Sequence, residues 1–193
     1  MAHTISQEIL SLKETLIQWR HHLHARPETA FEEKLTTQYI IEQLQSFGVD
    51  EILTHFAQTG VVALINGKSA GKTIGLRADI DALDGTEQSE VEYRSIHHGK
   101  MHACGHDGHT SILLGTAKYL AKNRDFAGSV VLIFQPAEEN EGGARVMVEN
   151  GLFNHFHIDY IFGLHNQPGQ AVNQFATCEG PIKAAYDIFE ISL

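Results

Sequence analysis

Apolar residues near the start of the chain recur at the spacing of amphipathic helices. One series follows a 3-4-3-4 spacing and consists of Ile9, Leu12, Leu16, Trp19 and Leu23. It predicts a helix with Thr4 and Gln7 as a capping box and an end near Pro27. A second series predicts a helix over residues 31–47 that stops at Gly48, a residue favoured after a helix end. Its predicted inward face consists of Leu35, Tyr39, Ile40 and Leu44.

Short apolar runs predict the strands. Residues 61–65 and 73–77 are rich in β-branched side chains and are joined by NGKSAGK, which suits a hairpin or a short loop. Residues 129–136 and 158–164 are apolar nearly throughout, which is typical of strands covered on both faces.

Two further helices alternate with these strands. One begins after Asp107 and runs to about Lys122, and a short one covers residues 143–150 and ends at Gly151. The predicted inward face of the longer helix consists of Ile112, Leu113, Ala117 and Leu120. The alternation predicts an α/β fold with a mostly parallel central sheet flanked by helices. In such sheets ligands bind beyond the carboxyl ends of the strands.

Composition narrows the classes of function. The 193 residues hold 14 basic against 24 acidic side chains, a net charge of -10, which argues against nucleic acid as a partner. No apolar run approaches the roughly 18 residues of a membrane span and no signal peptide opens the chain, so we expect no membrane association and a cytoplasmic location. Cys104 and Cys178 are too few for a disulfide framework. The 13 histidines point toward metal or proton chemistry.

The densest polar cluster is MHACGHDGHT, in the loop that leads into the third helix. Cys104 and His106 stand two residues apart, and a thiolate and an imidazole in that register suit a borderline-soft cation. The alternative is that Cys104 is a small buried apolar residue and the histidines are polar loop residues. Asp107 is expected at the N-cap or in the first turn of the helix, and His102 and His109 are not expected to be ligands.

Two more segments place metal-compatible groups after predicted strands. Glu138 and Glu139 follow the strand that ends at Pro136, and His165 follows the apolar run of residues 158–164. Separately, a solvated acidic turn or a polar strand end would explain each of them. Together with the loop described above they suggest one cation site, with Glu138 left over as a general base. The expected ligands are Cys104, His106, Glu139 and His165.

Weaker candidates surround this set. Asp79, in RADIDAL, could orient a ligand histidine from outside the metal site, although a loop acid is an equal interpretation. His21, His22 and His24 lie on the first helix and its exit, where we expect them to be solvated.

Five ordered motifs resemble the M20 metallopeptidase family, in particular its amidohydrolase branch of hippurate hydrolases, N-acyl-amino-acid amidohydrolases and auxin-conjugate hydrolases. The motifs are RHHLHARPETAFEE, GLRADIDAL, GKMHACGHDGHTSILLG, FQPAEENEGGARVMVENGLF and GLHNQPG. The resemblance implies two divalent metal ions (Mn, Zn, Co or Ni) at the edge of a zinc-exopeptidase-like α/β catalytic domain. It also implies a smaller lid domain that often forms a homodimer.

Carried over residue by residue, the resemblance implies that Cys104, His106, Glu139 and His165 are metal ligands and that Glu138 is the general base. The implied reaction cleaves the amide bond of a small N-acyl or N-aroyl amino acid, giving a carboxylic acid and a free amino acid. One departure concerns the loop after RADIDAL, where the family pattern continues with a proline and this chain has Asp84 and Gly85.

The tail AAYDIFEISL alternates in the manner of a strand, and family members are about twice as long. We therefore expect residues 1–185 to be the N-terminal part of the catalytic domain and residues 186–193 to be a first strand leading into an absent lid. Two alternatives stay open. The chain alone is a catalytically inactive fragment, or the protein is a metal-independent hydrolase with Cys104 as nucleophile, although Cys104 and His106 are close in sequence for such a pair.

Overall fold

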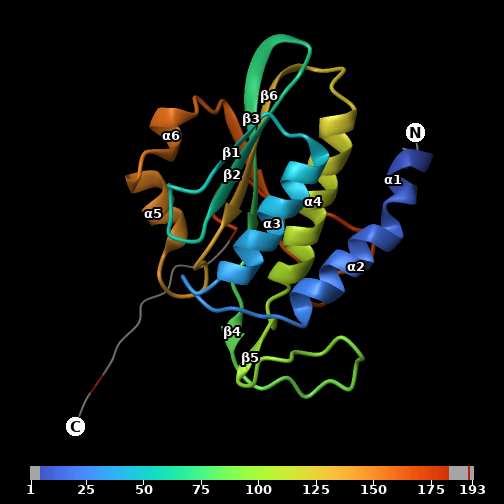
Figure 1. Cartoon of the computed structure of the whole chain (residues 1–193), viewed down its shortest axis with the longest axis vertical. Helices are drawn as coiled ribbons and strands as arrows, with labels where there is room; N and C mark the ends of the chain where they lie inside the picture. Colours follow the sequence, from blue (N-terminus) through green and yellow to red (C-terminus); the bar gives the residue numbers. More distant parts are fainter. Residues whose placement is uncertain (1–4, 183–190, 192–193) are drawn as a thin grey trace.

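A computed structural model describes residues 5–182 and residue 191 (Figure 1). The helices are α1 (Gln7–Ser11), α2 (Lys13–His24), α3 (Lys34–Phe47), α4 (His106–Lys122), α5 (Gly143–Glu149) and α6 (Leu152–His155). The strands are β1 (Glu51–Leu53), β2 (Val61–Asn66), β3 (Ser69–Asp79), β4 (Leu83–Asp84), β5 (Lys100–Met101), β6 (Ala127–Gln135) and β7 (Tyr160–Gly163). The strand expected at residues 186–193 lies outside the described residues.

The central sheet has the strand order β1-β2-β6-β3-β7. β6 and β7 each run parallel to β3, while β2 runs antiparallel to both β1 and β6. Four of the five strands therefore point the same way, which confirms the mostly parallel α/β fold. The short loop between β2 and β3 is confirmed, but the hairpin is wrong because β6 lies between these strands. The continuously apolar β6 needs a neighbour on each side and cover on both faces.

Helices cover both faces of this sheet (Figure 1). α3 and α4 pack on one face, where alternate β2 residues such as Val61 and Ala63 join the larger core cluster. The other face carries α5 and α6, and Val62 joins the smaller cluster there with Met147 and Leu152. The alternation of β2 side chains between two separate cores explains why this strand reads as apolar throughout.

Several local predictions are corrected. The first helix is interrupted at Leu12, and its N-cap is Ser6, while Thr4 lies outside the described residues. The second helix starts at Lys34 because Phe31 has a φ of 57°, which a right-handed helix does not tolerate. Gly48, with a φ of 72°, ends that helix as predicted.

Exposure corrects the predicted faces. Leu35 and Ile112 were expected inside, yet both are exposed, because the buried stripe of each helix passes through other positions, such as Ile40 in α3 and Leu114 in α4. The strand at residues 158–164 was expected to be covered on both faces, but β7 is the edge strand of the sheet and its side chains are exposed. Among the described residues, no helix is long and apolar enough to span a bilayer.

Leu114→Ala tests the packing of α4 on the sheet. The Leu114 side chain is fully buried, so its truncation leaves a cavity and should lower the free energy of unfolding by about 2–5 kcal/mol in urea titrations. Ile112→Ala, on the exposed side of the same helix, is the matched control and should cost less than about 1 kcal/mol. Equal losses in the two variants would show that the assignment of the helix faces is wrong.

Candidate metal centre

The candidate site lies at the carboxyl edge of the parallel strands. Asp79 is the last residue of β3, Glu139 follows β6 and His165 follows β7. Since these three strands are parallel neighbours, their carboxyl ends meet at one edge of the sheet. The N-terminal end of α4, with His106 as its first residue, reaches the same place.

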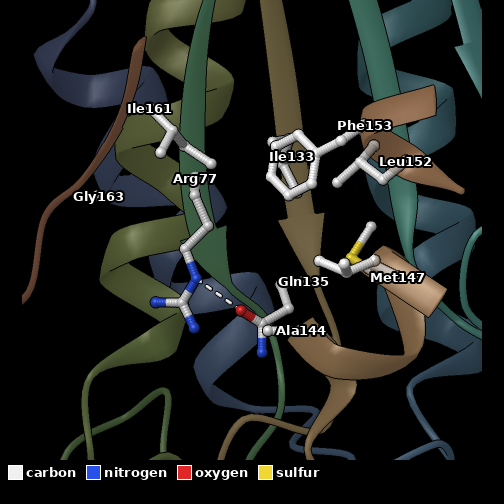
Figure 2. Close-up of a pocket in the computed structure, with 10 residues that line it drawn as sticks. Arg77, Ile133, Gln135, Ala144, Met147, Leu152, Phe153, Ile161 and Gly163 are labelled. Atoms are coloured by element: carbon white, nitrogen blue, oxygen red, sulfur yellow. Dashed lines mark hydrogen bonds between the residues drawn. The ribbon is translucent and has the colours of Figure 1, made fainter. Parts of the chain in front are cut away.

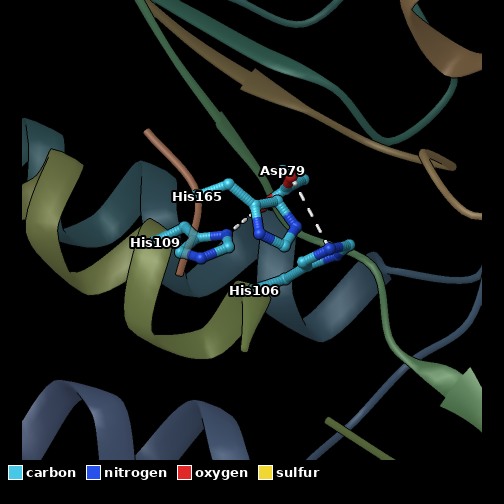
Figure 3. Close-up of side chains that lie close together, drawn as sticks. All are labelled: Asp79, His106, His109 and His165. Atoms are coloured by element: carbon cyan, nitrogen blue, oxygen red, sulfur yellow. Dashed lines mark hydrogen bonds and ion pairs between the residues drawn. The ribbon is translucent and has the colours of Figure 1, made fainter. Parts of the chain in front are cut away.

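The four groups expected as ligands lie together. Cys104, His106 and Glu139 offer ligand atoms that are all within 4.8 Å of one another. The Sγ atom of Cys104 lies 3.4 Å from Nε2 of His165, and the same limit of 4.8 Å joins His165 to His106. Figure 3 shows His106 and His165 converging with Asp79 and His109.

The His106 ring is held by Asp81. Its Nδ1 lies 2.9 Å from the backbone oxygen of Asp81 and 3.1 Å from the Asp81 carboxylate, so the Nδ1 proton is donated there. The other nitrogen, Nε2, is buried and has no hydrogen-bond partner in the described structure. It lies 3.6–3.9 Å from the carboxylates of Asp79, Glu139 and Glu138. A buried ring nitrogen that has no hydrogen bond and lies among carboxylates fits a bound cation, which would take the place of a proton there.

Asp81, and not Asp79, orients the ring of the proposed ligand His106 by accepting the hydrogen bond from its Nδ1. Besides holding His106, its carboxylate accepts the backbone N–H of Glu139 at 3.0 Å. Asp79 instead accepts hydrogen bonds from Nδ1 of His109 at 2.6 Å and from Arg77 at 2.7 Å. Two carboxylates spaced two residues apart after one strand look alike in sequence, so the pattern could not distinguish them.

Electrostatics make the site a region of negative charge. Burial opposes the ionisation of Asp79, but the hydrogen bond from His109 and the charge of Arg77 outweigh it and lower its pKa to about 2. Burial and the neighbouring Glu139 carboxylate raise the pKa of the Cys104 thiol to about 12. Without a cation the thiol therefore keeps its proton, whereas a bound cation would stabilise the thiolate.

His24 is the clearest error among the histidines, because it is buried rather than solvated. Its Nδ1 lies 2.7 Å from the carboxylate of Asp107, and its Nε2 lies 3.0 Å from Glu87. Asp107 also accepts from Arg20 at 2.9 Å. As one of the predicted alternatives stated, Asp107 lies in the first turn of α4, while Gly105 occupies the N-cap. These bonds tie α2, α4 and the loop after β4 into one unit.

The missing proline does not leave that loop unsupported. β4 pairs with β5 through Leu83 and Asp84, and the backbone N–H of Gly85 donates to the oxygen of Gly99 at 2.8 Å. Farther along, Glu87 accepts from the backbone of Ser95 and from the side chain of Ser89. Backbone pairing therefore closes the loop at the place where the resemblance leads us to expect a proline.

A separate cavity of about 300 Å³ lies beside α5, α6 and β7 (Figure 2). Its walls are largely apolar, and none of the four expected ligands lines it. Arg77 is the link to the candidate site, because its Nε donates to Gln135 in the cavity wall at 2.8 Å and its Nη1 donates to Asp79.

An α/β sheet with histidines, carboxylates and a thiol gathered at its carboxyl edge defines a class of proteins built to bind metal. The family described as Peptidase family M20/M25/M40 matches residues 75–190, which is more than half of the chain. The protein belongs to this family, and the resemblance seen in its motifs is confirmed.

Individual relatives agree. The chain is 43% identical over 186 residues to a hippurate hydrolase of Campylobacter jejuni, covering 96% of this chain and 48% of the relative. It is 41% identical over 191 residues to an N-acyl-L-amino acid amidohydrolase of Geobacillus stearothermophilus, covering 98% and 51%. A Bacillus subtilis structure, described as a dinuclear metal-binding peptidase of the M20 family, matches with a TM-score of 0.78 and 43% identity, over 83% of this chain and 44% of that one. The chain spans about half the length of the curated relatives it matches.

His24→Ala should destabilise the fold by about 1–3 kcal/mol, because it leaves two buried carboxylates with fewer partners. The hydrogen bond to Asp107 raises the pKa of His24, while the pKa of Glu87 falls to about 2 because bonds from Ser89, Ser95 and His24 outweigh its burial. Because the pKa of His24 is raised, its charge stabilises the fold at low pH, and this stabilisation is lost as the pH rises through that pKa. Because the pKa of Glu87 is lowered, its charge stabilises the fold above pH 4.5, and this stabilisation is lost as the pH falls toward about 2.

The difference in unfolding free energy between wild type and His24→Ala should therefore be largest between the ordinary pKa values of the two groups, 4.5 and 6.5, and shrink on both sides. Urea unfolding at pH values below, within and above this range measures it. His98→Ala, at an exposed histidine in the same loop, should show no such profile. A difference that does not vary with pH would contradict the raised pKa of His24 and the lowered pKa of Glu87.

Proposed function

We propose that the protein is a metal-dependent amidohydrolase that cleaves the amide bond of small N-acyl or N-aroyl amino acids, giving a carboxylic acid and a free amino acid. The observation that carries this proposal is the buried Nε2 of His106, which has no hydrogen-bond partner among the described residues and lies near three carboxylates. Two relatives, a hippurate hydrolase and an N-acyl-L-amino acid amidohydrolase, support the same class of substrate.

The proposed metal ligands are Cys104, His106, Glu139 and His165, which form a mixed set of sulfur, nitrogen and oxygen donors. Such a set suits zinc, manganese, cobalt or nickel, and ligand type alone does not choose among them. Two divalent ions per complete site are proposed, in line with the dinuclear description of the Bacillus subtilis structure.

Glu138 is proposed as the general base. Its side chain is 37% exposed, and its Oε2 lies 3.9 Å from Nε2 of His106, so it reaches both solvent and the proposed centre. Bound divalent cations supply Lewis-acid chemistry, which lowers the pKa of a water molecule and polarises the amide carbonyl. Glu138 accepts the proton of the attacking water and delivers it to the nitrogen of the leaving amine.

A metal-independent cysteine hydrolase is the second candidate, and one contact favours it. Cys104 Sγ lies 3.4 Å from Nε2 of His165, which is the pairing of nucleophile and base that this chemistry needs. The surrounding charge opposes it, because burial and the Glu139 carboxylate raise the pKa of the thiol to about 12. A nucleophilic cysteine needs surroundings that stabilise the thiolate.

The proposed activity refers to a protein as long as the curated relatives, of which this chain spans about half. The alternative, that the 193-residue chain alone is catalytically inactive, stays a prediction. Dimerisation through a lid, the absence of nucleic acid and membrane partners, and a cytoplasmic location stay predictions.

Glu138→Ala should lower kcat for hydrolysis of hippurate by about 10²–10⁴-fold, because the base is lost, while metal content stays at the wild-type level. Product release and elemental analysis, carried out at the length of the relatives, measure the two quantities. Glu141→Ala, in the same turn and exposed, is the control and should remain active. Full activity in Glu138→Ala would remove the assignment of the base.

Dialysis against a chelator distinguishes the two chemistries. The metallohydrolase should lose its activity as the metal leaves, and should regain it when a divalent cation is added back. A cysteine hydrolase needs no metal and would remain active throughout. Activity that survives complete removal of the metal, checked by elemental analysis, would therefore contradict the proposal.

A further inference from the structure

Asn166 follows the proposed ligand His165 and fixes its ring. The backbone oxygen of Asn166 lies 2.7 Å from Nδ1 of His165. A carbonyl oxygen only accepts, so Nδ1 carries the proton and Nε2 is left with its lone pair, facing Cys104 Sγ at 3.4 Å. The nitrogen that can bind a metal is therefore set by the residue next in the chain.

The same residue also contacts His109, in α4. Nε2 of His109 lies 3.0 Å from the backbone nitrogen of Asn166 and 2.6 Å from Oδ1 of its side chain. The other ring nitrogen of His109 donates to Oδ1 of buried Asp79, and Arg77 donates to Oδ2 of the same carboxylate. Both nitrogens of His109 are thus already bonded, so His109 is not a ligand although it lies within 4.8 Å of His106 and His165.

Asn166 touches the other ligand segment as well. Gly105 stands between Cys104 and His106, and a Cβ atom built on it would lie 2.4 Å from Oδ1 of Asn166. The φ of Gly105 is +95°, which other residues rarely adopt. Glycine at this position therefore permits Asn166 to pack directly against the loop that carries two proposed ligands.

The His165 segment follows an exposed edge strand. Among the described residues, hydrogen bonds join this segment to α4 and to the loop before it, from Asn166 to His109 and from His165 to Cys104. The contact between His165 and Cys104 joins two proposed ligands, whereas the contact between Asn166 and His109 does not.

We propose that the contact between His109 and Asn166 is a clamp that holds His165 against the Cys104 and His106 loop in the arrangement that a metal needs. His109 and Asn166 are positioning residues: they act through His165 and do not touch the metal or substrate. The clamp rests on the proposed metal centre, because its effect is to raise metal affinity.

Two substitutions at His109 separate its two bonds. The amide of asparagine reaches about as far as Nδ1 of histidine, so His109→Asn keeps a partner for Asp79 and loses the contact with Asn166. The longer glutamine reaches about as far as Nε2, so His109→Gln keeps the contact with Asn166 and loses the bond to Asp79. Titration with Co²⁺, followed by absorbance, measures metal affinity, and urea unfolding of the metal-free proteins measures stability.

The clamp predicts that His109→Asn weakens Co²⁺ binding by about 10–100-fold, while His109→Gln stays near the wild-type affinity. Gln167→Ala, at an exposed neighbour of Asn166, is the control and should bind as wild type does. A merely structural role would give the reverse order, since His109→Gln leaves buried Asp79 without its histidine. Equal affinity in His109→Asn and wild type, or weaker binding in His109→Gln than in His109→Asn, overturns the clamp.

If His109→Asn does not fold, Asn166→Ala provides the test. It removes only the side-chain contact and should also weaken Co²⁺ binding, whereas unchanged affinity overturns the proposal. Absence of Co²⁺ binding by the wild-type protein would overturn the metal centre of the proposed function, and the clamp with it. Normal binding by both wild type and His109→Asn would overturn the clamp alone.

Discussion

Carboxylates buried at the end of a sheet need positive charge or hydrogen-bond donors. Asp79 and Asp81 are both buried where β3 ends, and the acidic turn after β6 adds more negative charge beside them. Arg77 and His109 stabilise Asp79, while Asp81 is bonded to His106. One nitrogen of His106 then remains without a hydrogen bond in the described part of the chain. The proposed metal centre depends on this arrangement, because one bound cation would coordinate the nitrogen and neutralise the carboxylates.

The first turn of α4 distributes its side chains in two directions. His106 and His109, three residues apart, lie on the face toward the sheet edge, as helical geometry requires. Asp107 points instead toward α2, where His24 and Arg20 bind it. The first turn of α4 is thereby bonded to α2 on one side, while it presents the proposed ligand His106 on the other.

The sequence predicted the parts of the site that follow from strand order and donor chemistry. Strands of an α/β sheet end at a common edge, so groups after β6 and β7 could be expected near the loop before α4. Which acid orients His106 could not be predicted, because Asp79 ends β3 and Asp81 follows it two residues later. The burial of His24 also gave no local signal, since its partner Asp107 stands 83 residues away. Periodicity likewise does not report neighbours, which is why the place of β6 between β2 and β3 was missed.

Anomalous diffraction at the absorption edge of a bound metal tests the central claim most directly. In crystals grown with a divalent cation, we expect a peak within bonding distance of the proposed ligand atoms, which are Cys104 Sγ, His106 Nε2, His165 Nε2 and the Glu139 carboxylate. Nε2 of His106, which has no hydrogen bond in the described structure, should then be bonded to the metal. A site without a peak at saturating metal, or a peak bonded to other residues only, would contradict it.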